Sequence, residues 1–376
     1  MARILSDEQA RQGMRSSALS VISADLRKEP LSAPLHTLAA GVDKYALKTR
    51  SFSAPISLLR DATPGLESVL PQDIEIIHLH GINGALSMNS LAQLAEGRKI
   101  VWTLHDMNPF TGACHYSLGC ARFVSGCTGC PAVRAAFRGL VEANFARKIA
   151  TISEIPNLSL VAPSAWLADE ARGSAVFRDN QVSVIPNPVN PAYLHDDIGV
   201  GDTSKGGFQA ITIAKNLSDP VKAINVAVSA FQEAAQGSTD AKLTLVGSGG
   251  EAFAGPSIHL TGQLSTGELA QELSDSDVLI VPSRAENAPL VIAEAAARGC
   301  APLVADVGGM TEMITTLGYG KTFSSPQELT SLLKQLLARR GKRGATARRK
   351  VAQAARSQFS PEVIVARYGK VYEGNR

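Results

Sequence analysis

The chain has 376 residues, of which 45% are hydrophobic and 19% charged, and its formal net charge is +3. This length favours two domains of ordinary size, and the composition excludes global disorder. The charge is too small to indicate a nucleic-acid partner, and no apolar run approaches the roughly 20 residues of a membrane-spanning helix. Residues 1–8 are charged and lack the apolar core of a signal peptide, so we expect a cytoplasmic protein.

Short apolar strands alternate with amphipathic segments in the first half of the chain. Strands are predicted at residues 74–80, 99–104, 158–162 and 182–185. Near-continuous apolar runs are typical of parallel strands covered on both faces, and the segments between them favour right-handed helical crossovers. The pattern predicts an α/β fold with a doubly wound, Rossmann-like sheet. It stops in the proline- and glycine-rich stretch 186–207, where we place a domain boundary.

The same alternation resumes in the second half. It predicts strands at 208–214, 241–246, 278–282 and 302–305, and helices at 220–235, 265–273 and 289–298. Two such units in tandem would leave a cleft between them, at the carboxyl ends of the strands, where open α/β sheets bind ligands. The expected domains are 1–190 and 191–357, followed by a C-terminal helix at 358–376.

The region 339–356 is predicted to be helical and contains eight Lys or Arg and no acidic residue. A solvated helical face explains such a pattern. An anionic membrane surface is the alternative, and it would suit a lipid-linked acceptor. RNA is disfavoured because no stacking aromatic side chains are interleaved.

The segment 282–295 has the most informative pattern for function. A strand ends, a polar loop with Glu286 follows, and a helix is predicted to start with Pro289. Free N–H groups at a helix start bind phosphate, and carboxylates such as Glu286 and Glu294 suit sugar hydroxyls. On spacing alone, one glutamate near the helix start and one solvated glutamate would explain the pair as well.

Glu286 and Glu294 match the E-x7-E motif of the family-four, or group 1, retaining glycosyltransferases, and residues 70–376 resemble this family. The neighbouring segments 101–106, 161–167, 184–188 and 301–314 resemble it too. The resemblance implies the GT-B fold, in which domain one binds the acceptor, domain two binds the nucleotide sugar and the last helix crosses back to domain one. It also implies that Glu286 lies near the donor sugar and that Glu294 holds the ribose.

The donor diphosphate needs cations or amide groups around it. Lys215 ends one strand and Lys222 precedes the next helix, where the family has a basic pair, although Ala223 replaces the usual glycine. Either Lys215 or Asn216 takes the first place. Surface lysines would explain both positions equally well. Asn287, Ala288 and Leu290 are predicted to bind the nucleotide around the same turn.

Two further features concern close approach to the donor. Gly249 belongs to a glycine-rich turn that could let the backbone approach the nucleotide, or could simply be a turn. His105 ends a strand of the first domain and can donate a hydrogen bond to a sugar hydroxyl or a phosphate. A histidine satisfied within its own loop is the alternative. The family has a histidine at this place near the donor sugar, so we count His105 as a predicted catalytic residue with Lys215, Lys222 and Glu286.

Four of the five cysteines lie within seventeen residues: Cys114, Cys120, Cys127 and Cys130. Cys-x2-Cys is a usual half-site for structural zinc, whereas the other half is irregular. Free thiols or two disulfides are the alternatives. A similar cysteine-rich loop occurs in a branch of the family linked to surface polysaccharide assembly. Cys300 is expected to lie in a core.

The predicted function is transfer of a sugar from a nucleotide diphosphate donor to a saccharide or lipid-linked acceptor. The resemblance implies retention at the anomeric carbon without a catalytic metal. The family usually opens with a strand and a Gly-Gly turn, whereas residues 7–16 contain only Gly13. A non-catalytic partner subunit and a sugar-nucleotide epimerase of the same architecture therefore remain alternatives.

Overall fold

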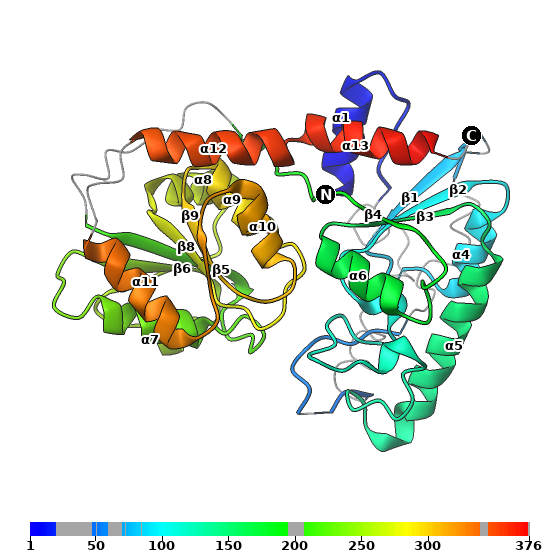
Figure 1. Ribbon diagram of the computed structural model, residues 1–376, viewed down its shortest axis with the longest axis horizontal. Helices are drawn as coiled ribbons and strands as arrows, with labels where there is room; N and C mark the ends of the chain where they lie inside the picture. The colour runs from blue at the N-terminus through cyan, green and yellow to red at the C-terminus, as the bar shows by residue number, and fades with distance from the viewer. Residues whose placement is uncertain are drawn as a thin grey trace, which may run out of the picture. The chain divides into compact units, whose positions relative to one another are not determined.

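We describe a computed structural model of the chain, which covers residues 1–19, 47–49, 51–58, 70–71, 73–83, 85–194, 207–338 and 345–374. Two compact units share the chain. The first unit comprises Ala2, Gln9–Ile185 and Arg367–Arg376, and the second comprises Met1, Arg3–Glu8 and Pro186–Ala366. Each unit contains one parallel sheet (Figure 1).

The first unit contains a four-stranded parallel sheet with the order β1-β2-β3-β4. Its strands are β1 (Ile76–His80), β2 (Lys99–Thr103), β3 (Leu158–Ala162) and β4 (Val182–Val184). The helices between them are α4 (Met88–Ala95), α5 (Arg138–Glu154) and α6 (Ala165–Gly173). These strands lie where the alternating pattern predicts them, with ends shifted by at most two residues.

The two faces of this sheet meet different partners. Ile100 and Trp102 share one hydrophobic core with side chains of α4, α5 and α6. Thr103 points to the opposite face, because side chains alternate along a strand, and its hydroxyl bonds Tyr368 in α13 (Pro361–Glu373). A segment about 265 residues further along the chain thus completes the first unit.

The second unit contains a six-stranded parallel sheet with the order β10-β9-β8-β5-β6-β7. Its strands are β5 (Gln209–Asn216), β6 (Lys242–Ser248), β7 (Ile258–Gly262), β8 (Val278–Val281), β9 (Ala301–Ala305) and β10 (Lys321–Phe323). The sheet grows from β5 in both directions, which makes it doubly wound. β7 and β10 are the two strands that the sequence analysis did not predict, and both are edge strands.

Helices cover both faces of the second sheet (Figure 1). One face packs on α7 (Ile224–Ala234) and α11 (Pro326–Ala338), where Phe231 and Leu329 are buried. The other face packs on α8 (Thr266–Asp275), α9 (Leu290–Ala297), α10 (Met310–Leu317) and α12 (Ala345–Phe359). Cys300 is buried in this second core, as predicted. Central strands buried on both faces explain their continuous apolar sequences.

Local signals fix several element ends. Ser87 and Ser164 cap α4 and α6 by accepting backbone N–H bonds, and Ser265 with Glu268 forms a capping box on α8. The sequence analysis predicted that the helix would start with Pro289. Helix α9 begins one residue later, at Leu290, and Pro289 is its N-cap residue. Short 3-10 helices lie at Asn108–Phe110, Arg122–Val124, Ala135–Phe137, Pro191–Tyr193 and Glu251–Phe253.

The chain opens with a helix, α1 (Ala2–Arg11). Residues 1–19, all of which are described, contain this helix and no strand. The opening strand that the family usually has is therefore absent from this stretch. Within the described ranges, no helix is long and apolar enough to cross a bilayer.

The predicted C-terminal basic region is helical over its described part, although residues 339–344 lie outside the described ranges. Its arginines do not all face solvent. Arg348 is 4% exposed and donates hydrogen bonds to the carbonyl oxygens of Ser274 and Ser276 at the end of α8. Arg349 and Lys350 are exposed. The prediction of a solvated helical face is therefore wrong at Arg348.

We expect the substitution Arg348→Ala to lower the free energy of unfolding by about 2 kcal/mol, because it leaves two helix-end carbonyl groups without their donor. Arg349→Ala is the matched control and should change it by less than about 0.5 kcal/mol. Urea unfolding followed by circular dichroism measures both. Equal effects of the two substitutions would show that the buried guanidinium is not a structural support.

Candidate functional site

The predicted residues of the second unit gather at one edge of its sheet. Strands β5, β6, β8 and β9 are parallel, so their carboxyl ends meet at the same edge. Lys215 lies at the end of β5, Gly249 follows β6, and Glu286 follows β8. In an open α/β sheet this edge is where ligands bind.

Lys222 and Glu286 form an ion pair at this edge. Lys222 Nζ donates to Glu286 Oε1, and the Ser283 hydroxyl donates to the same oxygen at 3.1 Å. The Glu286 side chain is 7% exposed, whereas that of Lys222 is 32% exposed. The carboxylate is thus fixed inside the loop, while the lysine side chain is partly exposed to solvent, from which an incoming phosphate could compete for the ammonium group.

Backbone bonds hold the two loops of this ion pair together. The Arg284 N–H donates to the carbonyl oxygen of Val221 at 2.8 Å, and the Val221 N–H donates to Asp219 Oδ1 at 2.9 Å. Ala223 then takes a left-handed conformation with φ 49°. Such a φ favours glycine, which the resemblance implies after the lysine at this place, and Ala223 carries the strain.

Gly308, in the loop after β9, touches the Glu286 backbone. Its φ is +57°, and a Cβ added there would lie 1.8 Å from the Glu286 carbonyl oxygen. Only glycine fits both the backbone angle and this close approach. The segment 301–314, which resembles the family, therefore supports the Glu286 loop from the neighbouring strand.

The start of α9 contains the remaining predicted donor-binding residues. Asn287 is 4% exposed, and the Ala288 carbonyl oxygen accepts a hydrogen bond from Asn187 Nδ2 at 3.3 Å. Leu290 is the first residue of the helix. One turn further on, burial raises the pKa of Glu294 to about 7, and its charge adds to the burial that raises the pKa of Tyr193. Glu294 is therefore a poorly solvated carboxyl group that would gain from hydroxyl donors.

Solvent exposure and local packing account for the surroundings of Lys215 and of the glycine-rich turn. Lys215 and Asn216 are both exposed. The Ser218 hydroxyl donates to the Gly249 carbonyl oxygen at 2.6 Å, and a Cβ on Gly247 would lie 1.8 Å from the Ala214 carbonyl oxygen. The turn after β6 thus packs on the end of β5, and this packing already explains its glycines.

In the first unit, His105 lies in a group of partly buried, hydrogen-bonded side chains. His105 Nε2 lies 2.9 Å from His80 Nδ1. On the same face of the sheet, His78 lies 2.8 Å from both the Thr103 and Tyr372 hydroxyl oxygens. Burial lowers the pKa of His78 to about 3 and that of His105 to about 4, so both imidazoles are neutral at pH 7.

A second hydrogen-bonded chain follows His105 directly. Asp106 Oδ2 lies 2.7 Å from His115 Nδ1, and His115 Nε2 lies 2.9 Å from the Ser57 hydroxyl oxygen. Lys148 is fully buried and donates to the carbonyl oxygens of Asn108 and Thr111, at 2.5 and 2.7 Å. Burial lowers its pKa to about 7. Both contacts hold the loop that carries the cysteines.

The four clustered cysteines line one pocket together with Phe52 and Phe123. All of them are free thiols. However, among the described residues no three His, Cys, Asp or Glu side chains are grouped so that they could hold a metal ion. The thiols have the softness that zinc prefers, but their arrangement does not fit a metal-ligand set.

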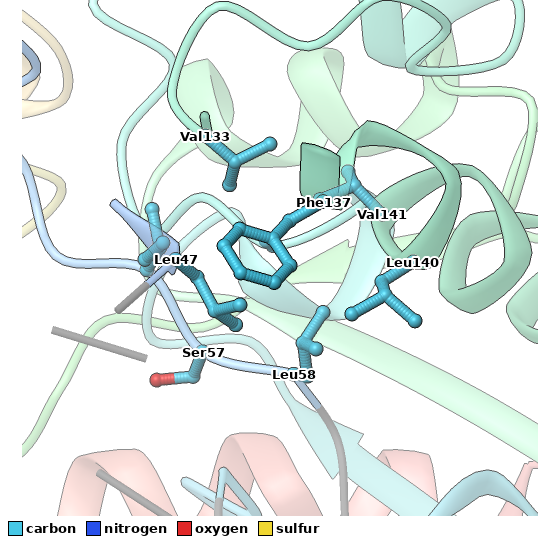
Figure 2. A pocket seen from close by; sticks show the side chains of 9 residues that line it. Leu47, Ser57, Leu58, Val133, Phe137, Leu140 and Val141 are labelled. Atoms are coloured by element: carbon cyan, nitrogen blue, oxygen red, sulfur yellow. The ribbon is translucent and has the colours of Figure 1, made fainter. Parts of the chain in front are cut away.

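An apolar cavity lies beside the cysteine loop. Figure 2 shows the Phe137 ring in the middle of the side chains of Leu47, Leu58 and Leu140, with the Ser57 oxygen pointing away from them. A cavity of this composition offers no partner for a charged diphosphate. We read it as part of the packing that supports the loop.

Sequence analysis missed several residues of these clusters. Ser283, Gly308, His80 and His115 were not singled out, although Ser283 and Gly308 lie inside segments that resemble the family. A sequence signal existed for His78 and His80. The two histidines lie two residues apart on one predicted strand and therefore point to the same face of the sheet. Their partners Tyr368 and Tyr372 lie too far along the chain for any local pattern to reveal.

We expect Gly308→Ala to lower the free energy of unfolding by about 2–5 kcal/mol, the sum of a left-handed backbone and an overpacked contact. Gly318→Ala is the matched control, since Gly318 has φ +60° but open space around its Cβ position. It should lower the free energy by only about 1–2 kcal/mol. Chemical unfolding of both variants tests the contact, and a difference of zero would contradict it.

Comparison with known proteins agrees with this architecture. Residues 209–339 match the family model of the Glycosyl transferases group 1. Over 316 residues the chain is 23% identical to WcaC of Escherichia coli (strain K12), a protein named for a proposed role as a colanic acid biosynthesis glycosyl transferase. The match covers 79% of this chain and 76% of WcaC.

Solved structures resemble the whole chain at low identity. Sucrose-phosphate synthase from Thermosynechococcus elongatus superposes with a TM-score of 0.58 at 17% identity, over 96% of this chain and 81% of that one. Anabaena HepE, solved in complex with UDP, superposes with a TM-score of 0.57 at 18% identity, over 80% and 78%. The chain therefore has the GT-B fold, and the family match supports a glycosyltransferase of group 1.

Proposed function

We propose that this chain transfers a sugar from a nucleotide diphosphate donor to a saccharide or lipid-linked acceptor, with retention, in the synthesis of a surface polysaccharide or glycoconjugate. The observation that carries the proposal is the Lys222–Glu286 ion pair at the carboxyl edge of a doubly wound sheet. The name of WcaC and the UDP bound to HepE support the polysaccharide context and a nucleotide donor.

The second unit would hold the donor. Lys222, whose side chain is partly exposed, would leave Glu286 and bind the diphosphate, with Lys215 as a further cation. Glu286 would then accept hydrogen bonds from the sugar, and Glu294 from the ribose. The backbone around Asn287, Ala288 and Leu290 would complete the nucleotide contacts, and Gly249 would lie near them on the neighbouring turn.

The reaction needs charge stabilisation more than proton transfer by the protein. As the sugar–phosphate bond breaks, negative charge grows on the diphosphate, and a lysine held in place beforehand stabilises that charge. The acceptor hydroxyl would attack from the side on which the diphosphate leaves, and a phosphate oxygen would take its proton. His105, neutral at pH 7, stays the predicted catalytic residue of the first unit and could donate a hydrogen bond.

Binding of nucleotide sugars by the isolated chain tests this proposal. We expect UDP-glucose, GDP-mannose or another member of a nucleotide-sugar panel to raise the unfolding temperature, and Lys222→Ala to weaken that binding at least tenfold. Lys334→Ala is the control, because Lys334 forms an exposed ion pair with Glu233 in the same unit. Unchanged binding in Lys222→Ala would contradict the proposed donor site.

Transfer assays then separate the enzyme from the alternatives. Product formation only with an acceptor indicates a transferase, whereas a changed donor sugar without an acceptor indicates an epimerase. Donor binding without either product would favour the non-catalytic partner subunit. A helix in place of the usual opening strand is the observation that keeps this last alternative open.

The raised pKa of Glu294 predicts a pH dependence of donor binding. Burial raises its folded-state pKa to about 7, and only the carboxylate accepts hydrogen bonds from both ribose hydroxyls. Donor affinity should therefore rise as pH increases from 6 to 8, by roughly tenfold at most. Titration calorimetry at several pH values measures this, and Glu294→Gln should bind more weakly with a flat pH profile. An equal slope in the variant would assign the titration to another group.

A further inference from the structure

The segment that leads from the first unit into the second contains a polar side chain that the proposed reaction does not use. The sequence analysis placed a domain boundary here, and the second unit begins at Pro186. Asn187 lies between Pro186 and Pro188. A proline has a fixed φ and restricts the residue before it to extended conformations, so this stretch of backbone has little freedom. The Asn187 side chain therefore projects from a rigid support.

The rest of this segment is anchored in the second unit. The Val189 N–H donates to the carbonyl oxygen of Phe359, the last residue of α12, at 2.8 Å. Val189 and Tyr193 are buried in the same hydrophobic core as Ile292 of α9. Segment 186–193 therefore belongs to the core that supports α9.

Asn187 contacts the residues before α9 through a hydrogen bond. Its Nδ2 donates to the Ala288 carbonyl oxygen at 3.3 Å. Its Oδ1 is buried, and none of the described residues gives it a hydrogen bond. A reversed carboxamide would place Oδ1 against the Ala288 carbonyl oxygen, so that two acceptors would face each other. The orientation with the amide N–H toward Ala288 is therefore the favourable one.

This bond holds a peptide group in the middle of the predicted donor contacts. The Ala288 carbonyl belongs to the peptide bond with Pro289, the N-cap residue of α9. Pro289 has no N–H and a fixed φ, so the direction of the Ala288 carbonyl group also sets the directions of the N–H groups of Ala288 and Leu290. Both of these residues are predicted to bind the nucleotide.

We propose that Asn187 is a positioning residue for the donor, whose carboxamide holds the turn from Ala288 to Leu290 in the geometry that receives the nucleotide diphosphate. This role rests on the proposed function, because it requires a donor at the turn. Asn187 acts through the backbone of Ala288 and does not have to touch the donor. A residue of the connecting segment, 101 positions before Ala288, would thus set the affinity of the second unit for its substrate.

The substitution Asn187→Asp tests the carboxamide as a hydrogen-bond donor. It keeps the shape of the side chain but places a carboxylate oxygen against the Ala288 carbonyl oxygen. We expect the variant to bind a nucleotide sugar about tenfold more weakly than the unaltered chain, because the turn loses a hydrogen bond and meets a like partial charge. Titration calorimetry measures this with the nucleotide sugar of the panel that raises the unfolding temperature most.

Asn190→Asp is the matched control in the same segment. Asn190 Oδ1 accepts a hydrogen bond from the Ala192 N–H at 3.0 Å, so this asparagine acts as an acceptor. An aspartate oxygen accepts the same bond, and the affinity for the nucleotide sugar should change by less than about twofold. A tenfold loss in both variants would show that a negative charge in the segment, and not the bond to Ala288, weakens binding.

Acidification adds a measurement that a general loss of stability would not reproduce. In the Asn187→Asp variant, a protonated carboxyl group has an O–H that donates to the Ala288 carbonyl oxygen, and burial raises the pKa of such a group. The dissociation constant of the variant, divided by that of the unaltered chain, should therefore fall as pH decreases from about 8 to about 5. Glu294 titrates in both proteins, so the ratio removes its contribution.

Urea unfolding checks that the variants fold. If Asn187→Asp does not, Asn187→Ala removes the hydrogen bond without adding a charge and should weaken binding about fivefold. Unchanged affinity in the folded variant, beside normal binding by the unaltered chain, would overturn the role of Asn187 and leave the proposed donor site in place. An unaltered chain that binds no nucleotide sugar would overturn the proposed function, and the role of Asn187 with it.

Discussion

The Lys222–Glu286 ion pair is the interaction on which the proposed donor site depends. A carboxylate as buried as that of Glu286 needs a counter-charge and hydrogen-bond donors, and Lys222 and Ser283 supply both. The bond from Arg284 to Val221 and the close approach of Gly308 keep the loops after β5, β8 and β9 in one place. The ammonium group of Lys222 is neutralised by Glu286, so in the proposed site a phosphate would exchange with Glu286 for it.

The two units stabilise their buried and partly buried polar side chains in different ways. In the second unit an ion pair is kept charged at the sheet edge, where one partner still reaches solvent. In the first unit the histidines around His105 are partly buried and stay neutral, and hydrogen bonds to hydroxyl groups and to each other satisfy them. A neutral His105 can donate a hydrogen bond without adding a positive charge to the site.

In the cysteine loop, the spacing of the cysteines alone does not predict how they are arranged. Cys-x2-Cys predicts a metal half-site, but the two ends of the loop pair with segments 47–49 and 51–58, which lie about sixty to eighty-five residues earlier in the chain. Among the described residues the cysteines are not grouped as a metal-ligand set. No count of intervening residues could have given this arrangement.

The sequence by itself determined the α/β class, the central strands of both sheets and the helix after Glu286, because buried parallel strands and helix starts leave local patterns. It also indicated the GT-B resemblance through segments such as 282–295. Only the tertiary structure decided the edge strands β7 and β10, the left-handed Ala223, the inward-facing Arg348 and the partner of His105. These features depend on contacts between residues far apart in the chain, and such contacts leave no periodic signal in a single sequence.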